Sequence, residues 1–226
     1  MLIQNEIPKE DLNYILEPFK EDKEENNKQI ISEKIIAIVR DVNGKIIDKR
    51  EQKMRSLTQY YLALMSIAIL GTYSGATGNT AQSILTNVLG LPSTGYTYGT
   101  NSLVINFDIS IQLGSGTQSF SPTLNSLNAP ISNGTGTGQL NYNSKSVSYT
   151  NNSISQLLIV SNISGNTITV SEIGLLGTIY MLYWNTSNVF TETPYNYLLS
   201  YDTFSSPISI PNGGYASFQI IITFSG

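Results

Sequence analysis

The sequence predicts an all-β protein, an antiparallel β-sandwich of the jelly-roll kind preceded by a β-hairpin and one short buried helix. Short runs of β-branched and aromatic residues recur through the second half of the chain. Clusters of Gly, Pro, Asn and Ser separate these runs, and no helical periodicity intervenes. The 226 residues suffice for one such domain with its own hydrophobic core.

Residues 1–29 are predicted to form a charged arm outside the sandwich. They hold eight acidic residues and four lysines around the apolar Leu12, Ile15, Leu16 and Phe19. Composition favours a flexible solvated tail, and the other interpretation is an arm whose apolar cluster docks on a neighbouring subunit. The segment lacks the basic start and apolar run of a signal peptide, so we expect no export by that route.

Residues 30–71 are predicted to form a hairpin followed by an anchoring helix. The pair Asn43-Gly44 stands between two β-branched runs and predicts a hairpin over residues 35–52, closed by a type I′ turn. Ser56 to Gln59 has the pattern of a capping box, and Gly71 is a stop signal. The apolar segment 57–70 is about 21 Å long as a helix, too short to cross a bilayer, so we expect a buried packing helix, and the alternative is a helix that touches a membrane.

Seven basic residues fall between Lys34 and Arg55. They are expected either to face solvent on the hairpin or to contact anionic lipid or an acidic partner. Tyrosines near the helix start suit an interface as well as sheet packing. The candidate anchoring residues are therefore Lys49, Arg50, Lys53, Arg55, Tyr60 and Tyr61.

Residues 72–226 are predicted to form the sandwich domain. Residues 103–113 alternate apolar and mostly polar side chains, which indicates a strand with one buried face. Along 139–150 the apolar phase changes between Tyr142 and Val147, which predicts a bulge. Turns are expected at 164–166, at Gly174 and at 211–214. Further strands are predicted at 139–150, 154–163, 166–173, 175–184, 196–204 and 215–224.

Charge is divided unequally along the chain. Residues 1–56 carry 11 Lys/Arg and 12 Asp/Glu, whereas residues 57–226 carry one lysine and four acids. A surface of hydroxyls and amides does not titrate, which suits an extracellular, acidic setting; a surface covered by neighbouring subunits has the same composition. One basic residue after Arg55 argues against nucleic-acid binding.

The composition also excludes most catalytic sites. Without Cys or His the chain cannot form disulfides, thiolate metal sites or a Ser–His pair. Nothing in the sequence ties the acids Asp108, Glu172, Glu192 and Asp202 into a catalytic pair, so we expect structural hydrogen bonds rather than catalysis, and no cofactor, metal or small-molecule substrate. The acceptor triplets for N-linked glycans begin at Asn133, Asn151, Asn162 and Asn185.

A series of short motifs follows in order along residues 35–226. They are Arg40-Asp-x-x-Gly-Lys45, Arg55-Ser56, Leu113-Gly-Ser-Gly-Thr117 with Ser121-Pro122, Gly134 to Leu140, Thr169 to Leu175, Tyr197 to Phe204 and Ile221 to Phe224. In the order of these motifs the chain resembles virion structural proteins of archaeal viruses.

The resemblance implies a β-sandwich subunit at a special position of a spindle-shaped or turreted icosahedral particle, such as a tail adaptor, a nozzle or a vertex base. We expect a homo-oligomeric ring that contacts other virion proteins and the viral membrane or the host surface. The protein would be assembled in the host cell and carried in the extracellular virion. The alternative is a cell-surface adhesin or glycan-binding module, in which exposed tyrosines stack on sugars.

Overall fold

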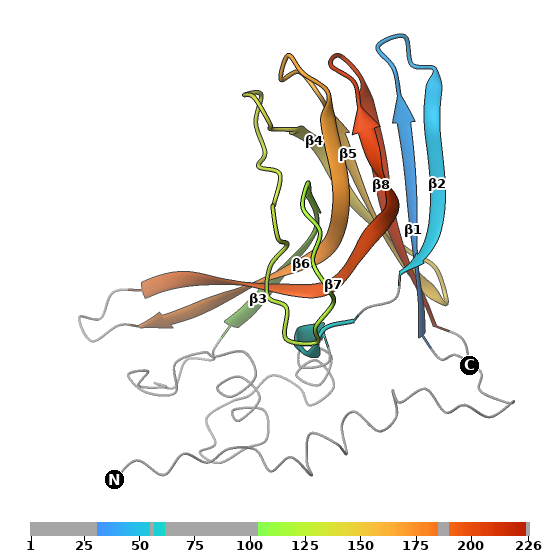
Figure 1. The fold of residues 1–226 in the computed structure, drawn as a ribbon. Helices are drawn as coiled ribbons and strands as arrows, with labels where there is room; N and C mark the ends of the chain where they lie inside the picture. Colours follow the sequence, from blue (N-terminus) through green and yellow to red (C-terminus); the bar gives the residue numbers. More distant parts are fainter. Residues whose placement is uncertain (1–30, 55–56, 62–103, 185–189, 225–226) are drawn as a thin grey trace, which may run out of the picture.

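The chain forms two antiparallel β-sheets in the computed structural model, which describes residues 31–54, 57–61, 104–184 and 190–224 (Figure 1). This confirms the predicted all-β class with antiparallel sheets. The described strands are β1 (Ile31–Arg40), β2 (Ile46–Met54), β3 (Val104–Gly114), β4 (Asn141–Tyr149), β5 (Ser153–Ser161), β6 (Ile168–Trp184), β7 (Phe190–Ile210) and β8 (Tyr215–Phe224).

The larger sheet has the strand order β2-β1-β8-β5-β4. Its centre is β8, which pairs with β1 from Ile31↔Phe224 to Arg40↔Tyr215 and with β5 on its other side. Alternate residues of β8, among them Phe218 and Ile220, are buried on one face. The predicted hairpin is therefore built into this sheet and does not stand before it.

The smaller sheet has the order β3-β6-β7, and its long β6–β7 ribbon extends to the side of the molecule in Figure 1. The sequence predicted two strands separated by a turn at Gly174, and this is wrong, because β6 runs unbroken through that position. A Cβ on Gly174 would lie 2.5 Å from Leu198 Cδ1 and 2.9 Å from Ser200 O. The glycine is thus required by the close approach of β7.

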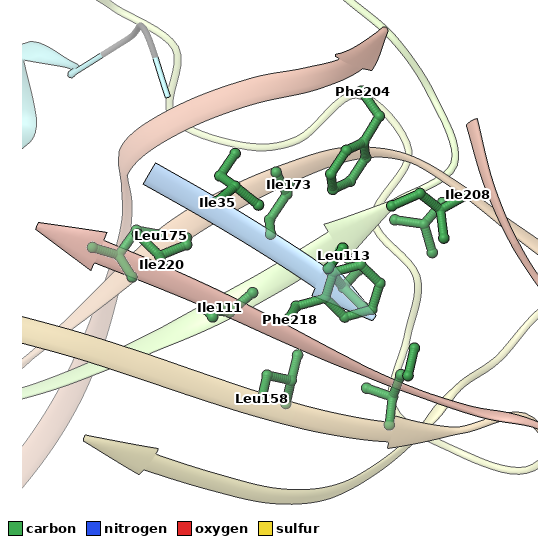
Figure 2. Packing of buried hydrophobic residues seen from close by; sticks show 14 of the residues in the cluster. Ile35, Ile111, Leu113, Leu158, Ile173, Leu175, Phe204, Ile208, Phe218 and Ile220 are labelled. Atoms are coloured by element: carbon green, nitrogen blue, oxygen red, sulfur yellow. The ribbon is translucent and has the colours of Figure 1, made fainter. Parts of the chain in front are cut away.

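Buried side chains of both sheets belong to one hydrophobic cluster. Figure 2 shows Ile35, Leu158, Phe218 and Ile220 of the larger sheet gathered with residues of β3, β6 and β7. The partners from the smaller sheet include Ile111, Leu113, Ile173, Leu175, Phe204 and Ile208. Each fully buried aliphatic or aromatic side chain stabilises the fold by about 1.5–3 kcal/mol, so this cluster holds the two sheets together.

The predicted hairpin is confirmed, but its turn differs from the expected type. The turn runs from Asp41 to Gly44, closed by the Gly44 N–H donating to Asp41 O at 3.0 Å, so its central residues are Val42 and Asn43. The Asp41 carboxylate accepts the N–H groups of Asn43 and Lys45, both at 2.9 Å. Gly44 has a φ of 81°, which only a glycine adopts without cost.

The predicted helix begins later than the capping box indicates. Leu57 forms an isolated β-bridge with Ser200, and the helical turn comprises residues 59–61. Thr58 is fully buried, and its hydroxyl donates to Leu198 O at 2.5 Å. Tertiary pairing with β7 therefore overrides the local signal at this point; Ser56 and the rest of the expected helix lie outside the described residues, as does the boundary at residue 72.

Candidate assembly interface

The predicted basic cluster is divided between the two faces of β2. Lys49 and Lys53 are exposed on the outer face, while Arg50 lies on the inner face, beside β7. The Arg50 guanidinium contacts Asp48 Oδ2 at 2.9 Å and donates to Ser206 O, to Ser206 Oγ at 2.7 Å and to Pro207 O at 3.3 Å. Arg50 thus fixes β2 to β7 within the chain, and Arg55 lies outside the described residues.

The two predicted tyrosines pack against the smaller sheet. The Tyr60 ring lies 5.3 Å from the Tyr197 ring, and Tyr61 is a buried member of the core cluster. Burial, with the nearby Glu33 charge, raises the pKa of Tyr61 to about 12. Tyr61 therefore contributes to the hydrophobic core, and this corrects the prediction of an anchoring role for it.

The four glycan acceptor sites are not equivalent. Asn133 and Asn151 are exposed, and Asn185 lies outside the described part of the chain. Asn162 is fully buried, and its Nδ2 donates to Asn166 O and Ile210 O, both at 2.7 Å. A glycan replaces one Nδ2 hydrogen, so at least one of these bonds would be lost in a buried site, and Asn162 is therefore withdrawn as an acceptor in the folded chain.

Two of the four candidate acids, Glu172 and Asp108, make structural contacts. Glu172 is fully buried, and its carboxylate accepts Ala129 N at 2.8 Å and Asn128 N at 3.2 Å, which ties the loop after β3 to β6. Asp108 forms an exposed ion pair with Lys145 at 2.7 Å. Within the described residues no group of three or more Asp, Glu, His or Cys side chains is arranged to hold a metal ion.

Sequence reasoning missed Glu33 as an unusual acid. Its side chain is 5% exposed, and neither carboxylate oxygen has a hydrogen-bond partner in the described structure. Burial, together with the charge of Asp202, raises its pKa to about 7. The signal was present, because Glu33 shares the inward phase of Ile35, Ala37 and Val39.

The edge strand β4 carries the strongest candidate for a contact surface. β4 pairs with β5 alone, so its other edge exposes backbone N–H and C=O groups without a strand partner in the described chain. The predicted bulge is confirmed by a register shift between Tyr142 and Ser144. Beyond this bulge, Val147 and Tyr149 turn to the face that β5 buries with Leu158.

This stretch of inner face is left uncovered. Val147 is 60% exposed and Tyr149 is 82% exposed, and their neighbours Ile154 on β5 and Ile109 on β3 are 42% and 40% exposed. The Gln156 side chain of β5 donates to the Ile109 carbonyl, which places Ile109 beside the two hairpin strands. We call Ile109, Val147, Tyr149 and Ile154 the β4 patch.

The β4 patch combines apolar side chains with an almost uncharged edge. In the sequences of β3, β4 and β5 the charged residues are Asp108 and Lys145, and they neutralise each other. Uncovered apolar side chains beside an unpaired strand edge suit a contact with another polypeptide. The sequence signal for the patch was the change of apolar phase before Val147, which we interpreted only as a bulge.

Comparison with protein families, with curated proteins and with solved structures found no match to this chain. Among the described residues, no helix has the length and apolar character needed to cross a membrane. The function is therefore inferred from the geometry above.

Proposed function

We propose that this protein is a non-enzymatic structural subunit that assembles side by side with copies of itself into a ring or vertex of an extracellular particle. The β4 patch carries this proposal, because it exposes four apolar side chains next to a strand edge that no other described strand pairs with. A neighbouring copy would cover the apolar surface and complete the backbone hydrogen bonds without burying an unpaired charge.

The finer fold and the biological setting form part of the same proposal. One hydrophobic cluster shared by both sheets supports a β-sandwich, and a jelly-roll variant with five and three strands is our preferred assignment. The resemblance of the sequence to archaeal virion proteins makes a tail adaptor or vertex base the setting we favour. Detection of the chain by mass spectrometry in purified virions, and density at a tail or vertex, would support it.

Assembly is tested by placing one charge on the patch. We expect the full chain to sediment as a ring-sized oligomer and Val147→Asp to sediment as the 24.8 kDa monomer, because assembly would bury the new carboxylate unpaired. Ser148→Asp is the matched control, since its exposed side chain belongs to the opposite face of the same strand.

The outcomes separate cleanly in analytical ultracentrifugation and negative-stain electron microscopy. An oligomer that survives in Ser148→Asp and dissociates in Val147→Asp supports the proposed contact. A wild-type chain that stays monomeric, or two variants that assemble equally well, would overturn it.

A further inference from the structure

Three tight turns lie together at one end of the molecule, at the top of Figure 1. They connect β1 to β2 (residues 41–45), β5 to β6 (162–167) and β7 to β8 (211–214). Asn162 and Gly213 link the last two turns, because Gly213 N donates to Asn162 O at 2.7 Å and Asn162 N donates to Gly214 O at 2.9 Å. Val42 of the first turn packs on Gly213, 3.4 Å from where a Cβ would stand.

This end exposes aliphatic side chains where turns normally carry polar ones. Val42 is 70% exposed at the centre of its turn, and Ile163 is 52% exposed near the start of the connection from β5 to β6. Ile46 and Ile47, at the start of β2, are 45% and 49% exposed. None of these four side chains belongs to the buried core, so their apolar character is not explained by the fold.

Basic residues lie on one side of this apolar end, on the β1–β2 hairpin. Lys45 and Lys49 are exposed, and Arg40 is half-buried with its guanidinium donating to Gly44 O at 3.1 Å. Of the two nearby acids, Asp41 accepts the N–H groups of its own turn and Asp48 pairs with Arg50. Among the described residues at this end, the charge that remains for an external partner is therefore positive.

We propose that this end docks on an anionic lipid bilayer, with Val42, Ile163, Ile46 and Ile47 entering the interfacial layer and Lys45 and Lys49 at the lipid phosphates. Exposed apolar side chains on turns that hydrogen bonds hold in place can enter the membrane interface without any rearrangement of the protein. The positive charge of Lys45 and Lys49 complements the negative surface potential of such a membrane. This docking site is separate from the proposed assembly contact, because it consists of different residues from the β4 patch.

Binding is measured by flotation of the full chain with vesicles of phosphatidylcholine and phosphatidylglycerol in equal parts, and with vesicles of phosphatidylcholine alone. We expect binding to the anionic vesicles that weakens with salt. The double variant Val42→Asp/Ile163→Asp should bind at least about tenfold more weakly, and Lys45→Gln and Lys49→Gln each about fivefold more weakly. Ser146→Asp, on exposed β4, is the control that should bind as wild type.

Membrane entry has its own readout. Because the chain has no cysteine, Val42→Cys can carry a single environment-sensitive fluorophore. Its emission should shift to the blue on anionic vesicles, whereas the same label at Ser148→Cys should not respond. Circular dichroism of each variant confirms that it is folded.

The docking proposal is overturned if the folded wild-type chain fails to float with anionic vesicles, or if Val42→Asp/Ile163→Asp binds as tightly as wild type. Repeating the flotation with Val147→Asp separates the two proposals. Vesicle binding by a monomeric Val147→Asp chain supports docking independently of assembly. Loss of assembly in Val147→Asp leaves the docking result unchanged.

Discussion

The two edges of the five-stranded sheet are built in opposite ways. The β2 edge is rich in charge, and Arg50 binds it to the β7 backbone through Ser206 and Pro207. The β4 edge is rich in serine, has one charged residue, and leaves Val147 and Tyr149 exposed. Within the described residues, Arg50 thus connects the β2 edge to β7, whereas the β4 edge carries the exposed apolar patch that we propose as the contact.

Charged side chains in this protein connect strands of the fold as well as face solvent. On the inner face of β2, Arg50 is held in place by Asp48 at 2.9 Å and reaches a strand more than 150 residues away. On β4, Lys145 forms an exposed ion pair with Asp108 of β3. Charged edges resist pairing with other strands, so we propose assembly through the less charged β4 edge.

The largest effect on stability is expected at β8, the central strand that lies between the β2 edge and the β4 edge. Phe218 on β8 is fully buried, and its ring lies 6.3 Å from that of Phe204 in the smaller sheet. Phe218→Ala should lower the free energy of unfolding by about 3–5 kcal/mol in urea titration, because it leaves a cavity between the sheets. Tyr215→Ala, at the exposed end of the same strand, is the control; equal losses would show that β8 is not the shared support.

An intermediate effect on stability is expected at Glu33, which lies on β1 opposite Met54 at the end of β2. Its pKa rises from 4.5 unfolded to about 7 folded, so the folded state binds more protons between these values. The free energy of unfolding should therefore fall as pH rises from 4.5 to 7, by about 3 kcal/mol, and stay low above pH 7. Glu33→Gln should remove this slope and stabilise the neutral protein.

The measurement for Glu33 is the midpoint of urea unfolding from pH 4 to pH 8. Glu51→Gln, which removes an exposed acid of β2, is the control and should keep the slope. A wild-type protein that gains stability between pH 4.5 and 7 would contradict the assigned burial. The expected direction, greater stability in acid, agrees with the acidic setting suggested by the composition.

The smallest effects on stability are expected for the charged side chains of the two edges, and they can be compared directly. Arg50→Met keeps the aliphatic stem but removes the bonds to Asp48 and β7, and should cost about 1–2 kcal/mol. Lys145→Met removes an exposed ion pair on β4 and should cost less than about 1 kcal/mol. Thermal unfolding of both variants tests the difference, and a larger loss for Lys145→Met would reverse our comparison.

Local patterns were enough to predict most strands and the bulge. The alternation in β3 and β8 and the phase change after Tyr142 are properties of neighbouring residues, so they can be read without tertiary contacts. Gly174 was misread as a turn because its reason, the approach of Leu198 and Ser200, comes from another strand. The candidate site shared this limit: the basic residues were found, but not that Arg50 points toward β7.

By itself the sequence determined an all-β chain with a charged beginning, a nearly uncharged remainder and no histidine or cysteine chemistry. Tertiary structure alone decided that the hairpin joins β8 in one sheet, that Asn162 is buried and that the β4 patch is exposed. The physical reason is that strand period and turn chemistry act over a few residues. Sheet order and exposure depend on pairings between residues far apart in the chain.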